Sequence, residues 1–237
     1  MASELSRRRF LGTAGTLAAA TTGAGLARAA HAAEGENQTS IKVLGICCSP
    51  RKGKSTFTSL QVCLEAAEAV ADNIEVELIE LAGLKINGSA AAGIPLDDGQ
   101  KDDFPDLIPK LSDPKVAGII IGTPVYMGNM SSLCKEFLDR CSIFRQGFKF
   151  ADKVAGVVAV AGGRNGGQEL TIRSVHNCLL GLSMIIVGDG PPTGHWGGTV
   201  WSGAPGGVSN DEYGMKTVKN LGHRVADVAL RLSRGTV

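Results

Sequence analysis

Two short segments of the chain are apolar throughout: VAGIIIG at residues 116–122 and VAGVVAVA at residues 154–161. Both are too short for a typical helix and rich in β-branched residues, so each is expected to be a strand buried on both faces. IKVLGIC at residues 41–47 and SMIIVG at residues 183–188 fit the same description. Residues 74–80 alternate apolar and charged side chains, as in a strand nearer a sheet edge. This pattern is typical of a parallel sheet covered by helices.

Helical patterns separate these strands. The expected helices cover residues 55–71, 104–111, 131–144, 167–182 and 211–232. Strict alternation predicts an α/β fold, a doubly wound five-stranded parallel sheet with right-handed crossovers. Two long segments, residues 81–103 and 189–210, interrupt the alternation. Both follow the carboxyl end of a strand, where ligands bind in open α/β sheets.

The start of the chain has the composition of an export signal. Three arginines at residues 7–9 precede a mildly apolar run rich in Ala, Gly and Thr, and Ala30-His31-Ala32 offers a small-x-small cleavage site. SRRRFL at residues 6–11 resembles the twin-arginine signal, which implies export of a folded protein, often with its cofactor inserted. An amphipathic N-terminal helix of the folded domain is the alternative. The expected organisation is a signal peptide at 1–32, a linker at 33–40 and one domain at 41–237, in the periplasm or another extracytoplasmic compartment.

Charge and cysteine content argue against several classes of function. Lys and Arg total 24 against 23 Asp and Glu, so no basic excess favours nucleic acid as a partner. No stretch beyond the leader reaches the roughly 18 apolar residues of a membrane span. The six cysteines show no C-x-x-C spacing and no clustered histidine, so no metal site is expected. Buried thiols are the preferred interpretation, although export leaves disulfides open.

The segment CSPRKGKST, residues 48–56, joins the first expected strand to the first expected helix. The amino end of a helix offers unpaired N–H groups to an anion, and hydroxyl and cationic side chains add to them here. The residues expected to hold a phosphate are Ser49, Arg51, Lys54, Ser55 and Thr56. The alternative is an ordinary turn with a serine or threonine cap. A nucleoside-triphosphate loop is disfavoured, because Cys48 replaces its first glycine, Pro50 removes a donor, and neither 116–122 nor 154–161 ends in a Mg²⁺-binding aspartate.

Three motifs together carry a family resemblance: SPRKGKST at residues 49–56, TPVYMGNMS with LCKEFLDR at 123–140, and GGRNGGQE at 162–169. The set resembles the flavodoxin-like NADPH-dependent FMN reductases and iron–sulfur flavoproteins over residues 41–232. This resemblance implies a flavodoxin-like sheet of order 2-1-3-4-5 and FMN as cofactor, with its phosphate on residues 49–56. It also implies NAD(P)H as electron donor and a homodimer or higher homo-oligomer.

The second and third motifs are expected to hold the flavin ring. Gly128 and Asn129 allow the backbone to approach a flat ring closely. Tyr126 could stack or edge against the ring, or pack on the next helix instead. Arg164 would lie near the negative charge of reduced flavin or cap Glu169 on the surface. The remaining expected contacts are Pro124, Val125, Met127 and, by resemblance, Gly163.

The two long loops, residues 81–103 and 189–210, lead to separate expectations. The iron–sulfur flavoproteins carry a compact cysteine motif after the second strand, but residues 81–103 contain no cysteine, so no iron–sulfur cluster is expected. The acidic pairs Asp97-Asp98 and Asp102-Asp103 are interpreted as a solvated loop rather than a cation site. The other loop, residues 189–210, contains His195, Trp196 and Trp201. It is interpreted as a cover over the flavin or a dimer contact, with local packing of the tryptophans as the alternative.

The resulting hypothesis is an exported FMN-dependent oxidoreductase that transfers electrons or hydride to a small acceptor such as a quinone, a metal ion or a flavin. A flavodoxin-like electron carrier with a redox-protein partner, and a nucleotide-binding protein without redox activity, are the alternatives. An exported enzyme meets little NAD(P)H, so a protein or quinol donor stays open. No residue is assigned as catalytic, and His195 and Arg164 are only candidates.

Overall fold

The computed structural model describes residues 40–235, so the predicted signal peptide and the linker up to residue 39 lie outside the described residues. The strands are β1 (Ile41–Cys47), β2 (Ile74–Glu80), β3 (Val116–Pro124), β4 (Val154–Ala161), β5 (Ile185–Ile186) and β6 (Gly198–Trp201). The α-helices are α2 (Ser55–Glu68), α3 (Ile108–Leu111), α4 (Ser132–Arg140), α5 (Gln168–Gly181) and α6 (Glu212–Arg234). The 3₁₀ helices are η1 (Gly88–Ala92), η2 (Pro105–Leu107), η3 (Cys141–Phe148) and η4 (Val208–Asn210). Within residues 40–235, none of these helices has the length and hydropathy that a membrane crossing requires.

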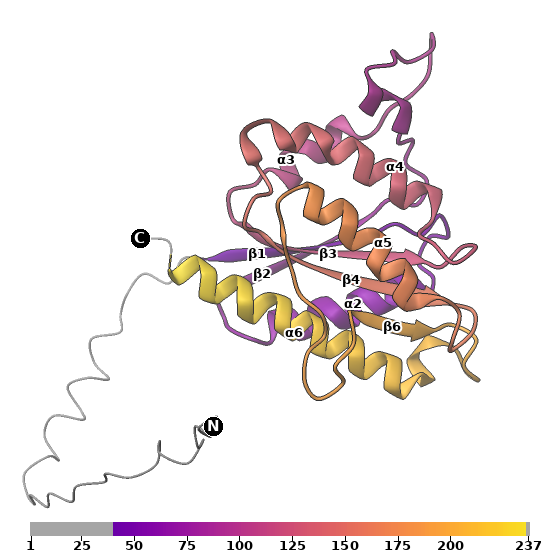
Figure 1. Cartoon of the computed structure of the whole chain (residues 1–237), viewed down its shortest axis with the longest axis vertical. Helices are drawn as coiled ribbons and strands as arrows, with labels where there is room; N and C mark the ends of the chain where they lie inside the picture. Colours follow the sequence, from indigo (N-terminus) through magenta and orange to yellow (C-terminus); the bar gives the residue numbers. More distant parts are fainter. Residues whose placement is uncertain (1–39, 236–237) are drawn as a thin grey trace, which may run out of the picture. The chain divides into compact units, whose positions relative to one another are not determined.

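The strands form one parallel sheet of order β2-β1-β3-β4-β5, which confirms the predicted order. β1 lies between β2 and β3, and β3 pairs with β4 along most of its length. Figure 1 shows α3, α4 and α5 on one face of the sheet and α2 and α6 on the other. The fold is therefore flavodoxin-like and doubly wound, with the carboxyl ends of β1, β3 and β4 at one edge.

The fifth position of the sheet differs from the prediction of one strand at residues 183–188. β5 is only two residues long and pairs with the start of β4, whereas β6 pairs with the end of β4 at Val158–Ala161. Between them runs VGDGPPTGHWG, in which two prolines cannot donate to a strand ladder. The chain leaves the sheet there and returns at Gly198–Trp201, inside the segment that the sequence presented as one long loop.

Two apolar clusters hold the helices to the sheet. On one face Ile121 packs with Phe137 of α4 and Ile172 of α5, and on the other Leu60 of α2 packs with Leu221 of α6. Both faces are buried because β4 is apolar at every position and β3 at every position except the buried Thr123, as the apolar runs of the sequence predicted. Each fully buried side chain of this size contributes about 1.5–3 kcal/mol relative to an exposed one. The sheet is thus a rigid base for the loops at its carboxyl edge.

Helix α2 is fixed in place by a close contact with α6. Gly222 of α6 lies directly against the backbone of Cys63, and a methyl group added at Gly222 would overlap that backbone. The absence of a side chain at this crossing lets the two helices approach closely, and Figure 1 shows them side by side. The amino end of α2 is therefore held beside the carboxyl ends of β1 and β3.

All six cysteines are free thiols, and all but Cys178 are buried. Burial raises the pKa of Cys47 to about 11 and raises the pKa of Cys63 as well. Both thiols are therefore protonated near neutral pH, and they pack as small apolar side chains. Their burial agrees with the preferred interpretation from the sequence.

Candidate functional site

The phosphate loop, residues 48–54, leads into a helix whose first turn has no side-chain cap. Lys54 is the N-cap residue of α2, and its side chain accepts no hydrogen bond from the helix. By contrast, Ser131 caps α4 and Asp211 caps α6, each accepting from a backbone N–H of the first turn. The first N–H groups of α2 are therefore without the acceptor that a serine or threonine cap would give. The alternative of an ordinary capped turn does not describe this helix start.

The phosphate loop also carries unpaired positive charge. Arg51, Lys52 and Lys54 are exposed, and none of them joins an ion pair within the described part of the chain. Ser49 and Thr56 are buried below them, with Ser55 half-buried between, and the Ser49 hydroxyl accepts the Arg51 N–H at 3.2 Å. The five residues expected to hold a phosphate thus lie together around one uncapped helix end.

One residue of the phosphate loop has a partner that the sequence did not indicate. The Gly53 N–H donates to Oε1 of Glu80 at 2.6 Å, and Glu80 is the last residue of β2. Gly53 has a φ of +63°, a conformation that favours glycine, and the bond to Glu80 holds it there. Glu80 is distant in sequence, and only the neighbouring positions of β1 and β2 in the sheet could have suggested it.

The segment after β3 is a rigid two-residue turn. Tyr126 and Asn129 exchange two backbone hydrogen bonds of 2.8 and 3.0 Å, and both central residues, Met127 and Gly128, have positive φ. Pro124 ends β3, and the Val125 N–H donates to the carbonyl of Val160 in β4 at 2.8 Å. Tyr126 is 42% exposed and Met127 is fully exposed. Both side chains are therefore accessible to a ligand on this turn.

The three motif loops meet at one edge of the sheet. The Ser131 hydroxyl donates to the carbonyl of Cys48 at 2.7 Å and so joins the phosphate loop to the segment after β3. A methyl group at Gly167 would lie 3.4 Å from Cα of Gly128, so the loop after β4 touches the same turn. Gly163 lies in that loop, where its carbonyl accepts from Nε2 of Gln168 at 2.8 Å. The structure therefore brings together the residues from all three motifs that the sequence selected.

Arg164 has a partner that neither sequence expectation included. Its Nη2 donates to Oδ1 of Asp211 at the start of α6, and its guanidinium lies 5.8 Å from the ring centroid of Trp201. The Asp211 side chain is only 2% exposed, and no bond to Glu169 is present in the described residues. Opposite charge in a buried position is the stronger attraction, which explains why Arg164 turns to Asp211 rather than to an exposed acid.

The segment from Asp189 to Asn210 contacts its own domain. Trp201 closes β6, and its indole Nε1–H donates to the carbonyl of Gly162 at 2.8 Å. Trp196 lies against Arg173 of α5, with 4.6 Å between the guanidinium carbon and the ring centroid. The tryptophans therefore pack locally, as the alternative from the sequence allowed. The His195 ring lies 5.6 Å from the ring of Tyr213 in α6.

Asp102 and Asp103, in the loop after β2, anchor that loop, which corrects the interpretation of a solvated loop for this pair. Asp102 pairs with Arg140 of α4 at 2.7 Å, and the two side chains are only 8% and 10% exposed. Asp103 accepts the Lys85 N–H at 2.8 Å and pairs with Lys101. The exposed Asp97 and Asp98 still fit the original interpretation. Burial of Asp102 depends on an arginine from α4, which sequence spacing alone could not indicate.

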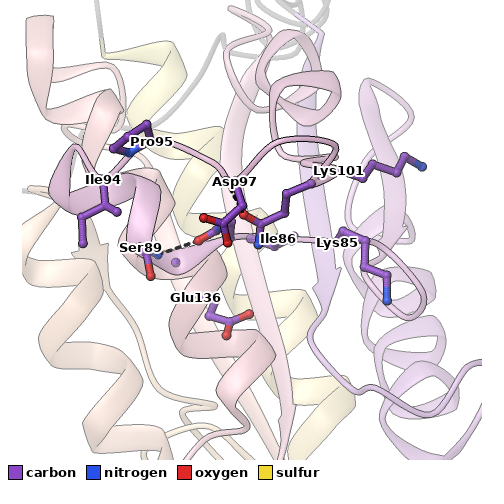
Figure 2. A pocket seen from close by; sticks show the side chains of 11 residues that line it. Lys85, Ile86, Ser89, Ile94, Pro95, Asp97, Lys101 and Glu136 are labelled. Atoms are coloured by element: carbon purple, nitrogen blue, oxygen red, sulfur yellow. Dashed lines mark hydrogen bonds between the residues drawn. The ribbon is translucent and has the colours of Figure 1, made fainter.

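The same loop surrounds a polar cavity of about 750 Å³. Figure 2 shows Asp97 and Ser89 over the cavity and Glu136 of α4 below them, while the ends of Lys85 and Lys101 point away from these acids. The lining contains carboxylates, amides, lysines and the apolar residues Ile86, Ile94 and Pro95, but no thiol. Iron–sulfur clusters are held by thiolates, so this lining does not fit a cluster.

Comparison with known proteins gives four further findings. Residues 41–196 match the family described as NADPH-dependent FMN reductase. An iron–sulfur flavoprotein of Methanocaldococcus jannaschii is 42% identical over 192 residues, covering 79% of this chain and 97% of that protein. The structure of a WrbA-like flavodoxin from Agrobacterium tumefaciens aligns with a TM-score of 0.57 at 22% identity, covering 81% of this chain and 99% of that one. An NAD(P)H:acceptor flavoenzyme of Paracoccus denitrificans aligns with a TM-score of 0.57 at 16% identity, covering 81% and 98%.

Proposed function

The chain belongs to the NADPH-dependent FMN reductase family and is an FMN-dependent oxidoreductase, and we propose that it works outside the cytoplasm and passes electrons to a small acceptor. The main support for placing the cofactor phosphate at residues 48–54 is the phosphate loop itself. Its helix end is uncapped, and its three cations have no ion pair within residues 40–235. A phosphate monoester carries roughly −1.5 to −2 charges near pH 7, which complements this loop.

The residues present fit FMN. Ser49, Ser55 and Thr56 offer hydroxyl donors to the phosphate, and Arg51 and Lys54 offer charge. The isoalloxazine ring would lie along the turn from Pro124 to Asn129 and the loop at Gly163, because these segments touch one another beside the phosphate loop. FMN supplies the redox chemistry when bound, and the chain's own residues bind and orient it. The sequence offers one phosphate-loop motif, at residues 48–56, which favours FMN over FAD.

The family description suggests the electron donor. The family description names NADPH, which supports NAD(P)H as the donor. Export would place the protein where NAD(P)H is scarce, and then a quinol or a redox protein is the donor. No iron–sulfur cluster is proposed, although the M. jannaschii relative is called an iron–sulfur flavoprotein, because residues 81–103 hold no cysteine.

The cofactor proposal is tested on the purified protein. We expect a yellow protein that releases FMN rather than FAD on denaturation, as judged by chromatography of the released cofactor. Metal analysis should find neither iron nor labile sulfide. A colourless protein that takes up no FMN would overturn the proposal, and several irons per chain would show that thiols outside residues 81–103 bind a cluster.

Export is tested separately, so that its failure leaves the cofactor proposal intact. The full chain should appear in the periplasmic fraction of its host as a shortened protein. Replacing Arg7 and Arg8 with lysine keeps the charge but removes the arginine pair, so the variant should accumulate unprocessed in the cytoplasm. A single Arg28→Lys change, outside the pair, is the matched control. Unaltered export of the double variant would exclude the twin-arginine route.

A further inference from the structure

A cavity of about 460 Å³ lies at the edge of the sheet where the strands begin, opposite to the edge that carries the phosphate loop. Figure 1 shows the carboxyl end of α6 at this edge. The starts of β3 and β5 and the end of α6 give the cavity apolar walls, and its polar side chains are those of Asp152, Lys153, Arg231 and Ser233. The volume falls within the roughly 300–1,000 Å³ of small-molecule sites.

Lys153 is the cation of this cavity that has no carboxylate partner. It is half-buried, and its Nζ donates to the backbone carbonyl of Val116. Among residues 40–235, no carboxylate oxygen lies within 4.0 Å of that nitrogen. An ammonium group has three N–H donors, so the described chain leaves two of them for a ligand. Burial lowers the pKa of Lys153 below its usual range, because apolar surroundings disfavour the charged amine.

The acids nearest to Lys153 do not neutralise it. Asp113 attracts the ammonium group at longer range, but its own ion pair is with Lys42, at 2.7 Å. Asp152 lines the cavity, but it is exposed, so water screens its charge. A ligand that brings an anionic oxygen to Nζ of Lys153 would therefore supply what the described chain does not.

The polar groups at the end of α6 are balanced among themselves. The last carbonyl groups of a helix carry partial negative charge, and Arg231 and Arg234 in the last turn offset it. Arg231 also pairs with Asp227 at 2.8 Å, and the Ser233 hydroxyl donates to a carbonyl of its own helix. Because these groups are matched within the helix, the charge of Lys153 determines which ligands suit the cavity.

We propose that this cavity binds a small apolar monocarboxylate, whose carboxylate group pairs with Nζ of Lys153 and whose carbon chain lies against the apolar walls. Hydrogen bonds between an ammonium and a carboxylate are charge-assisted and stronger than neutral ones. A wholly polar anion such as phosphate is a poorer match, because it would leave the apolar walls without a partner. The site lies at the sheet edge away from the phosphate loop, so the inference is independent of the proposed function.

The test compares two probes of the same shape, hexanoate and its neutral amide, hexanamide. The full chain is labelled with ¹³C at its alanine methyl groups, and each probe is titrated by NMR at pH 7. Ala117 of β3 and Ala229 of α6 line the cavity, so their methyl signals should shift as the probe binds. Because a hydrogen bond to a charged group is the stronger kind, hexanoate should bind about ten- to a hundredfold more tightly than hexanamide.

Three variants separate charge from shape. Lys153→Met removes the ammonium group and keeps an unbranched apolar side chain, so it should abolish the preference for hexanoate and leave hexanamide affinity nearly unchanged. Ala117→Leu fills part of the cavity from β3 and should weaken binding of both probes. Lys149→Met, at an exposed lysine outside the cavity, is the matched control and should bind both probes as the parent chain does.

Two results would overturn the inference. One is a parent chain whose Ala117 and Ala229 signals do not respond to hexanoate, or respond equally to hexanamide. The other is a folded Lys153→Met variant that keeps the preference for hexanoate. If Lys153→Met does not fold, the comparison of the two probes on the parent chain and on Ala117→Leu still decides the matter. FMN titration of the same variants should match the parent, so failure of this site and failure of the proposed function are distinguishable.

Discussion

The phosphate loop and the segment from Asp189 to Asp211 both carry charge at the carboxyl edge of the sheet, but they balance it differently. Arg51 and Lys54 are exposed and have no ion pair within the described chain. Asp189 and Asp211 are buried, and groups of the chain itself donate to both of them. Charge that the fold leaves unpaired is available to a ligand, whereas charge that the fold pairs holds the structure. The first region should therefore govern affinity, and the second should govern stability.

The largest expected effect is on cofactor binding. Replacing Arg51 and Thr56 together with alanine removes one cation and one hydroxyl from the phosphate loop. Because a hydrogen bond to a charged group contributes about 1.5–3 kcal/mol, FMN affinity should fall at least about tenfold and up to a few hundredfold or more. Stability should change by roughly 1 kcal/mol, because Arg51 is exposed but Thr56 is buried and loses a methyl group together with its hydroxyl. Flavin fluorescence titration and urea unfolding measure the two quantities.

The control for this pair is Lys219→Ala, which removes an exposed cation of α6 far from the phosphate loop in sequence. It should leave FMN affinity unchanged. An unchanged titration of the double variant would reject the placement of the phosphate. Loss of folding in the double variant would show that the loop is held by its charges, and the contrast between the two regions would then be lost.

Asp211→Ala, in contrast to the phosphate-loop variant, is expected mainly to lower stability. Asp211 accepts from the Trp201 N–H at 2.7 Å, from the Gly214 N–H at 3.0 Å and from Arg164. Removing it leaves buried donors without an acceptor, so the free energy of unfolding should fall by about 3 kcal/mol. Asp227→Ala removes an exposed i,i+4 pair with Arg231 on the same helix and should cost less than about 0.5 kcal/mol. Equal urea midpoints for the two variants would contradict the structural role of Asp211.

The fold also buries one histidine, His176, in its uncharged form. Burial lowers the pKa of His176 on α5 to about 4, and its Nε2 has no hydrogen-bond partner. The folded chain therefore keeps this ring neutral, while the unfolded chain protonates it below about pH 6.5. Stability from this group is complete above pH 6.5 and falls as the pH drops toward 4. The loss should be on the order of 2–3 kcal/mol.

The pH prediction is measured as a difference between variants, because carboxylates also titrate in this range. Urea unfolding at pH 7 and pH 4.5 should show a smaller acid-induced loss for His176→Leu than for the parent chain. His223→Gln, at an exposed position, should follow the parent. An identical acid-induced loss in all three proteins would mean that His176 reaches water in the folded state.

The fold could be predicted from the sequence because its signals are local. Residues 116–122 and 154–161 are apolar at every position, and each run is followed by a helical pattern, so the strands could be predicted from short windows. The order of the strands in the sheet, by contrast, was implied by the family resemblance. The strands at the fifth position of the sheet were harder to predict. Ile185–Ile186 and Gly198–Trp201 share one neighbour, β4, and only the three-dimensional sheet shows that two short strands divide its length. Because the segment between β5 and β6 is rich in glycine and proline, the sequence pattern indicated a loop and not a second strand.

The candidate site could be predicted where one loop holds all its parts, and not where distant segments meet. The phosphate loop is contiguous, so its residues could be selected from the sequence. Glu80 meets Gly53 across two strands, and Arg164 meets Asp211 across 47 residues of sequence. Pairings of this kind depend on side-chain positions that periodicity does not contain.

The smallest expected effect tests whether the segment around Trp196 belongs to the fold or to the flavin site. Arg173 of α5 lies over the Trp196 ring at 4.6 Å, and Trp196 is half exposed, so the contact should contribute about 0.5–1 kcal/mol. Arg173→Ala should lower the free energy of unfolding by that amount, shift tryptophan emission to the red and leave FMN affinity unchanged. Asn177→Ala, one helical turn further along α5 and exposed, is the control. If Arg173→Ala instead weakens FMN binding or changes how strongly the flavin quenches tryptophan emission, the segment covers the flavin. Its charges would then belong with those of the phosphate loop, because they would serve the ligand rather than the fold.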